Sequence, residues 1–140
     1  MNVEFGVDVD APAERLWDIL ADVKAWPEWE AASFVRPPTG AVETGTTFQA
    51  GLGGFAWAVS VTEADRPRKL AWVGRRTGLW GVHEWEFVEE AGRTRATTRE
   101  TMHGWLLPFL YPMVKRALAH TDEKWLADLK ARAESSAVPD

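Results

Sequence analysis

The stretch that decides the fold is residues 80–103, WGVHEWEFVEEAGRTRATTRETMH. In its first half, His83, Trp85 and Phe87 alternate with Glu84 and Glu86. Successive side chains of a β-strand point to opposite faces of the sheet, and carboxylates prefer the face that water reaches. The pattern therefore predicts a strand over 80–89 whose inner face carries His83.

The second half of the stretch, 93–103, reads as the next strand and admits two parities. One parity puts Glu100 on the inner face, whereas the other buries both Arg95 and Arg99 there. Two arginines are harder to bury than one glutamate. We therefore expect the arginines outside and Glu100 inside.

This parity sets a register in which the numbers of paired residues sum to 183. Opposite charges then meet on both faces, because His83 lies across from Glu100 and Glu84 lies across from Arg99. A three-residue loop with Gly92 in the left-handed region would shift the sum by one, and the inward and outward side chains of the second strand would then exchange faces. The sequence leaves these two registers open.

Turn residues divide the preceding chain into short alternating runs, which is typical of consecutive antiparallel strands. We predict strands near 31–36, 46–51, 55–63 and 68–75. The glycine-rich run 51–54 lacks the Lys and Ser/Thr of a phosphate loop and lies between strands, so it predicts a hairpin turn, with a secondary role as a gate. The next turn would set Trp72 opposite His83.

The two ends of the chain carry the remaining elements. Residues 2–9 alternate as a strand, and 12–23 have helical spacing behind a proline in the first turn. Pro27 predicts a kink or a second short helix. After Gly104 the period returns to 3.6 residues, which predicts a long helix ending before a flexible tail at about 135–140. Its inward stripe is Leu107, Tyr111, Val114, Leu118, Thr121, Trp125 and Leu129.

This order of elements is distinctive, and several short motifs accompany it: APAERLWD at 11–18, RPRKLAW at 66–72, HEWEF at 83–87 and ETMHG at 100–104. Together they resemble the polyketide cyclase/dehydrase and lipid-transport branch of the START-like superfamily (SRPBCC proteins). The resemblance implies one α+β helix-grip domain over 1–140. In that fold a seven-stranded antiparallel sheet wraps around a long C-terminal helix, with a short helical insert after the first strand.

The family likeness also implies a deep cavity for apolar or aromatic small molecules between sheet and helix, but no particular reaction. Nine tryptophans in 140 residues favour such a hollow, although a solid tryptophan-rich core is the alternative. Trp17, Trp26, Trp29 and Trp125 read as scaffold. The expected ligand-binding residues are Phe48, Trp57, Val59, Leu70, Trp72, Trp85, Thr98, Leu107, Tyr111 and Val114.

The expected catalytic residues are His83 and Glu100. Inside an apolar cavity the carboxylate favours the imidazolium and desolvation opposes it, which leaves a histidine able to exchange protons near neutral pH. His83 would act as acid and base in a cyclisation or dehydration, with Glu100 orienting it. The competing interpretation is a buried polar bridge that only holds the strand register.

Composition excludes several other functions. The net charge is −5, without a basic cluster, which argues against nucleic acid, and no cysteine is present for thiolate catalysis or metal binding. The histidines fall on different faces, so we expect neither a metal nor another cofactor. The chain start lacks the pattern of a signal peptide, which predicts a cytoplasmic protein without stable membrane insertion.

Two questions stay open at this level. The uncharged segment 105–114 reads first as a lid or cavity lining, with a dimer contact or a membrane-touching lip as alternatives. The expected function is binding of a hydrophobic, aromatic or polyketide-like molecule, with or without catalysis. The alternatives are a non-catalytic carrier for lipids or hydrophobic metabolites, and an interaction module with a vestigial cavity.

Overall fold

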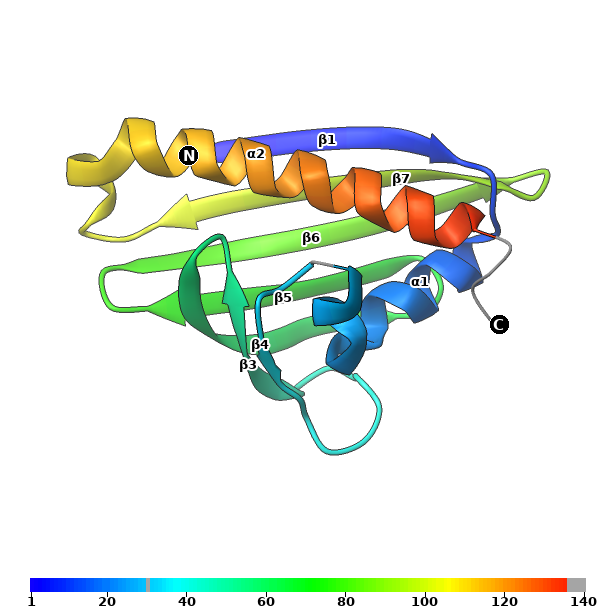
Figure 1. Ribbon diagram of the computed structural model, residues 1–140, viewed down its shortest axis with the longest axis horizontal. Helices are drawn as coiled ribbons and strands as arrows, with labels where there is room; N and C mark the ends of the chain where they lie inside the picture. Colours follow the sequence, from blue (N-terminus) through cyan, green and yellow to red (C-terminus); the bar gives the residue numbers. More distant parts are fainter. Residues whose placement is uncertain (30, 136–140) are drawn as a thin grey trace.

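Seven antiparallel strands form one curved sheet, and a long C-terminal helix lies across it (Figure 1). The computed structural model describes residues 1–29 and 31–135. The strands are β1 (Asn2–Val9), β2 (Val35–Arg36), β3 (Thr47–Leu52), β4 (Phe55–Asp65), β5 (Lys69–Arg76), β6 (Leu79–Glu90) and β7 (Arg93–His103). The helices are α1 (Ala13–Ala21), the 3-10 helix η1 (Val23–Trp29) and α2 (Leu107–Glu134). The strand order β1-β7-β6-β5-β4-β3-β2 confirms the predicted α+β helix-grip architecture.

The elements follow the sequence closely, with two differences. The predicted helix 12–23 is shorter, and the chain continues as η1, which contains Pro27. The predicted strand 31–36 is reduced to the two residues of β2. The predicted end at Arg36 is correct, because Pro37 and Pro38 follow and proline cannot donate a hydrogen bond to a ladder. The missing part is the start, where the N–H of Ala31 donates to the carbonyl oxygen of Trp26 at 2.9 Å instead of to a neighbouring strand.

The hairpin between β6 and β7 adopts the register in which paired numbers sum to 183. His83 pairs with Glu100, and Glu84 pairs with Arg99. The connection has only two residues, Ala91 with a φ of 54° and Gly92 with a φ of 80°. Two consecutive residues at positive φ are typical of a type I′ turn, whose twist matches that of the flanking strands. This turn excludes the alternative three-residue loop.

Half of the inner face is a solid aromatic core. Trp26 of η1 packs against Phe48, Trp72 and Trp125 at ring-centroid distances of 5.5, 5.3 and 5.2 Å. Its indole N–H donates to the carbonyl oxygen of Leu20 at 2.9 Å, so the buried polar atom is satisfied. The predicted scaffold role of Trp26 is confirmed.

Helix α2 buries a stripe that begins later than expected. Its buried residues are Val114, Leu118, Asp122, Trp125, Leu126, Leu129 and Ala133. Tyr111 is 42% exposed, so its predicted inward position is wrong. Trp105, two residues before α2, and Phe109 and Met113 in its first turns lie in solvent, with exposed fractions of 68%, 77% and 54%. The expected flexible tail falls on 136–140, outside the described residues, apart from Ser135.

Candidate functional site

A cavity of about 70 Å³ with mainly apolar walls lies between the inner face of the sheet and α2. Its walls include Trp57 of β4, Trp72 of β5, and Val114 and Trp125 of α2. The hairpin turn at Gly53 also borders it, and we keep the gate role of this turn as a proposal. This volume is below the range of roughly 300–1,000 Å³ that is typical of pockets for drug-sized ligands. The walls must therefore move apart to admit a ligand of that size.

Two glycines account for the hollow at this place in the sheet. Gly74 of β5 and Gly81 of β6 pair directly, and both line the cavity. A β-carbon added at Gly74 would meet Trp57 Cε3 at 3.5 Å, an ordinary contact. These two positions therefore contribute no side chain of their own to the wall, and Trp57 on one side and Met102 and Glu100 on the other border the patch.

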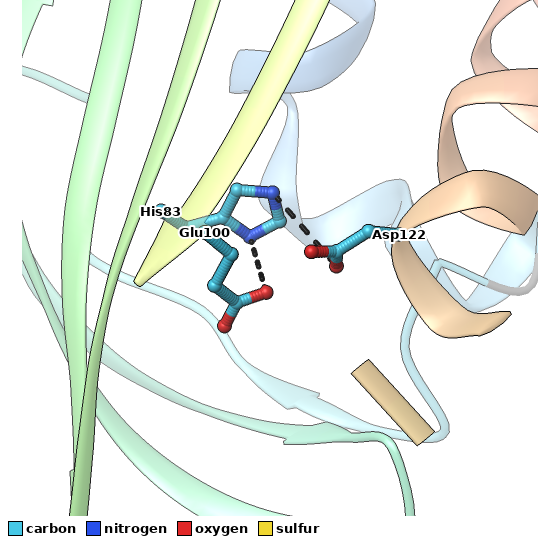
Figure 2. A group of neighbouring side chains, drawn as sticks. All are labelled: His83, Glu100 and Asp122. Atoms are coloured by element: carbon cyan, nitrogen blue, oxygen red, sulfur yellow. Dashed lines mark ion pairs between the residues drawn. The ribbon is translucent and has the colours of Figure 1, made fainter. Parts of the chain in front are cut away.

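His83 occupies the polar corner of the cavity (Figure 2). Its ring is buried, and Nε2 shares a hydrogen bond of 2.7 Å with the hydroxyl of Thr98. Nδ1 lies 3.4 Å from Oε1 of Glu100 on β7. The ring stacks on Trp85 at a centroid distance of 5.2 Å, which holds the plane of the imidazole in place.

A third ionisable residue, Asp122 of α2, completes the cluster. Figure 2 shows its carboxylate pointing at the imidazole from the helix side, with Oδ1 4.0 Å from His83 Nε2. Asp122 is 1% exposed, and its Oδ2 has no hydrogen-bond partner among the described residues. The three residues therefore converge on one point from β6, β7 and α2.

The environment moves the pKa values of the cluster away from their ordinary values. Burial lowers the pKa of His83, while the negative charges of Asp122 and Glu84 oppose this change. Burial raises the pKa of Glu100 well above its ordinary value, and the charge of Asp122 and a hydrogen bond with that residue add to the rise. Burial therefore shifts both residues towards their uncharged forms, the neutral imidazole of His83 and the protonated carboxyl group of Glu100.

The expected ligand-binding residues fall into three groups. Trp57, Trp72 and Val114 border the cavity, as do His83 and Glu100. A second group is buried but does not line it: Phe48, Val59, Leu70, Trp85 and Thr98. The two remaining residues, Leu107 and Tyr111, are half-buried and exposed, respectively.

The second group fails as cavity lining because large side chains cover that part of the sheet. Trp26 lies over Phe48, and Trp125 lies 5.6 Å from Trp85 between ring centroids. The expectation that Trp57, Trp72 and Trp85 border one cavity is therefore wrong for Trp85. Its buried indole instead stacks against the imidazole ring of His83.

Sequence reasoning missed Asp122. A signal was present, because Asp122 stands between Leu118 and Leu129 on the apolar stripe of the helix, where a carboxylate is out of place. An acidic residue on a buried stripe needs a partner or a function.

The same three residues also meet the distance requirement for holding a metal ion. One ligand atom each from His83, Glu100 and Asp122 lie within 4.8 Å of one another. Both ring nitrogens of His83, however, already face protein groups, Thr98 and Glu100. The hydrogen bond that His83 makes among the described residues goes to Thr98, outside this group of three, and the absence of a metal remains a prediction.

The fold and the site define a helix-grip protein with a polar cluster in an apolar cavity. The family model described as polyketide cyclase / dehydrase and lipid transport matches residues 1–134, and the chain belongs to this family. Membership supports binding of hydrophobic small molecules in general. No curated protein sequence matches the chain. Among the described helices, none combines the length and apolar character needed to cross a membrane.

Solved structures share the fold at low sequence identity. A hypothetical protein from Helicobacter pylori has a TM-score of 0.82 at 21% identity, covering 96% of this chain and 88% of that chain. The Zhui aromatase/cyclase from Streptomyces sp. R1128 has a TM-score of 0.76 at 19% identity, with coverages of 96% and 93%. A START superfamily protein from Mycobacterium smegmatis has a TM-score of 0.73 at 18% identity, with coverages of 95% and 97%.

Proposed function

We propose that this protein binds a hydrophobic, aromatic or polyketide-like small molecule in the cavity and moves protons on it in a cyclisation or dehydration. The observation that carries the proposal is the convergence of His83, Glu100 and Asp122 on one corner of an otherwise apolar cavity. A few polar groups in an apolar pocket are what a small-molecule site needs. Buried ionisable groups with displaced pKa values are frequent at catalytic sites.

The two pKa changes assign complementary roles. A neutral His83 is available to remove a proton from the carbon next to a ligand carbonyl group through Nδ1, because burial disfavours its charged form and Nδ1 makes no hydrogen bond among the described residues. A protonated Glu100 can give its proton to a hydroxyl group that leaves as water, in addition to orienting the imidazole. Asp122 would stabilise the imidazolium formed in the first step.

Two unsatisfied polar atoms add support for a polar ligand group at this corner. Asp122 Oδ2 and the indole N–H of Trp125 are buried without hydrogen-bond partners among the described residues, and both residues line the cavity. One is an acceptor and the other is a donor. A hydroxyl group or an enol of a ligand could satisfy both, which would repay their cost of burial.

The test uses 4-hydroxy-4-(2-naphthyl)butan-2-one, a β-hydroxy ketone. Removal of an α-proton and departure of the hydroxyl group as water give a conjugated enone that absorbs in the near ultraviolet. We expect the wild type to accelerate this reaction, and His83→Ala and Glu100→Gln to lose most of the acceleration. Arg75→Gln, an exposed change on β5, is the matched control. Equal rates for the wild type and His83→Ala would refute the catalytic role.

A carrier function is the second candidate, and the exposed apolar residues before and within the first turns of α2 favour it. Trp105, Phe109 and Met113 are spaced four residues apart and stand in solvent, an arrangement suited to contact with a ligand donor. In this case the cluster would only bind the ligand. Native mass spectrometry of the purified protein would reveal a co-purifying lipid or metabolite.

A cytoplasmic location, one domain over 1–140 and homodimerisation remain predictions.

A further inference from the structure

Arg76, the last residue of β5, is a neighbour of several residues that line the cavity. Side chains of β5 alternate between faces, so Arg76 shares the inner face with Trp72 and Gly74, which line the cavity. Its partner on β6 is Leu79, which lines the cavity too. The neighbouring Arg75 belongs to the opposite face and is exposed.

The guanidinium of Arg76 packs on an aromatic ring and has no counter-charge in the part of the chain that the structure describes. Its Cζ lies 4.4 Å from the ring centroid of Phe55, another cavity-lining residue. Its Nε is buried without a hydrogen-bond partner, and the ion pairs found among the described residues do not include Arg76. Burying a cation that lacks a protein partner costs free energy, and a bound anion would offset that cost.

We propose that Arg76 is an anion subsite that binds a carboxylate at the outer end of the cavity ligand, an inference that rests on the cavity of the proposed function. Phe55 covers one face of the guanidinium, which leaves its edge N–H groups as donors. A planar carboxylate matches such an edge with two parallel hydrogen bonds.

The charges at the two ends of the cavity orient this ligand. Asp122 lies at the inner end and its negative charge repels an anion, whereas Arg76 attracts one at the rim. Trp72 is paired with His83, and Arg76 lies further along β5, about 13 Å away at roughly 3.3 Å per residue. The ligand class is therefore an amphipathic acid, with its reacting group at His83 and its carboxylate at Arg76.

The probes are 2-naphthoate and 2-naphthamide, which have nearly the same shape and differ in charge at pH 7. Isothermal titration calorimetry would measure both with the wild type, Arg76→Gln, Arg76→Lys and Arg75→Gln, after thermal unfolding has shown that each variant is folded. We expect Arg76→Gln to weaken naphthoate binding about tenfold or more, as for a lost charge-assisted pair. Naphthamide binding should be unchanged in Arg76→Gln. The naphthoate affinity of Arg76→Lys should lie between those of the wild type and Arg76→Gln. Arg75→Gln should match the wild type.

Three results would overturn the subsite. Arg76→Gln could leave naphthoate affinity unchanged, it could weaken both probes equally, or Arg75→Gln could have the same effect as Arg76→Gln. Wild-type binding of naphthamide tests the cavity separately. If naphthamide binds and naphthoate is insensitive to Arg76→Gln, only the subsite is wrong, whereas if neither probe binds, the cavity of the proposed function is wrong too.

Discussion

The imidazole Nε2 of His83, on β6 between β5 and β7, lies 4.0 Å from Oδ1 of Asp122 on the C-terminal helix α2. Both residues are almost completely buried. Water is scarce there, so the charge on one residue acts strongly on the protonation of the other. This relationship couples the sheet to the helix electrostatically. The charges at the polar corner of the cavity therefore depend on pH.

Asp122→Asn should lower the pKa of His83 further. The negative charge of Asp122 favours the imidazolium against the dominant effect of burial, and the amide removes that charge. Glu84 would remain as a smaller favourable charge, and Glu100 on β7 faces the other ring nitrogen. An NMR titration of the His83 ring protons measures the change. Glu123→Gln, on the exposed side of α2, is the control, and a higher pKa in Asp122→Asn would contradict the assignment.

Glu100→Gln should become more stable than the wild type as pH rises. The folded-state pKa of Glu100 is raised, so its contribution to stability is complete below the ordinary value of 4.5 and is lost as pH rises towards the folded value. Glutamine does not ionise, and its advantage should be near zero at pH 4 and should grow towards pH 8. Urea unfolding at several pH values tests this, with Glu90→Gln as an exposed control.

His83 contributes to this pH dependence with the opposite sign. Its folded-state pKa is lowered, so the folded protein loses stability as pH falls below the ordinary value of 6.5. The loss occurs in the wild type and in Glu100→Gln, and their difference isolates Glu100 to first order. A constant difference between the two proteins from pH 4 to pH 8 would show that Glu100 ionises normally.

Trp85→Ala and Trp57→Ala should separate stability from binding. Trp85 is fully buried beneath His83, and its truncation should cost about 3–5 kcal/mol of unfolding free energy. Trp57 is half-buried at the cavity wall, where its N–H donates to the Leu52 carbonyl oxygen at 3.0 Å. Its truncation should cost about 1–2 kcal/mol and abolish most 2-naphthamide binding. Denaturant unfolding measures the stability of both variants, and calorimetry measures their affinity for 2-naphthamide. If Trp85→Ala lost 2-naphthamide binding and Trp57→Ala kept it, the position of the cavity would be wrong.

Gly74→Ala should reduce ligand binding without harming the fold. The added methyl group meets Trp57 at an ordinary contact distance and projects into the cavity. Stability should stay level or rise by about 0.5–1 kcal/mol, because glycine is unfavourable inside a strand. Gly81→Ala, by contrast, would bring its methyl group to 3.2 Å from Met102 Cε and should be less well tolerated. Unchanged 2-naphthamide affinity in folded Gly74→Ala would place the ligand elsewhere.

The sequence by itself determined the sheet and narrowed the pairing of β6 with β7 to two registers, one of which sets His83 opposite Glu100. Alternation of charged and apolar residues over 80–103 predicts which side chains turn inward, and the burial cost of Arg95 and Arg99 selects the parity. These are local rules, because a hairpin brings together residues that are close in the chain. The choice between two registers rested on the turn, which the structure resolves through the positive φ of Ala91 and Gly92.

Only the tertiary structure decided where the cavity lies and which residues complete its polar corner. Trp26 and Trp125 fill the space over Phe48 and Trp85, whereas the paired glycines leave space beside Trp57. Asp122 reaches His83 because α2 packs at one rotation and depth against the sheet. Such packing depends on the shapes of side chains far apart in the chain, which the period of a single helix or strand does not encode.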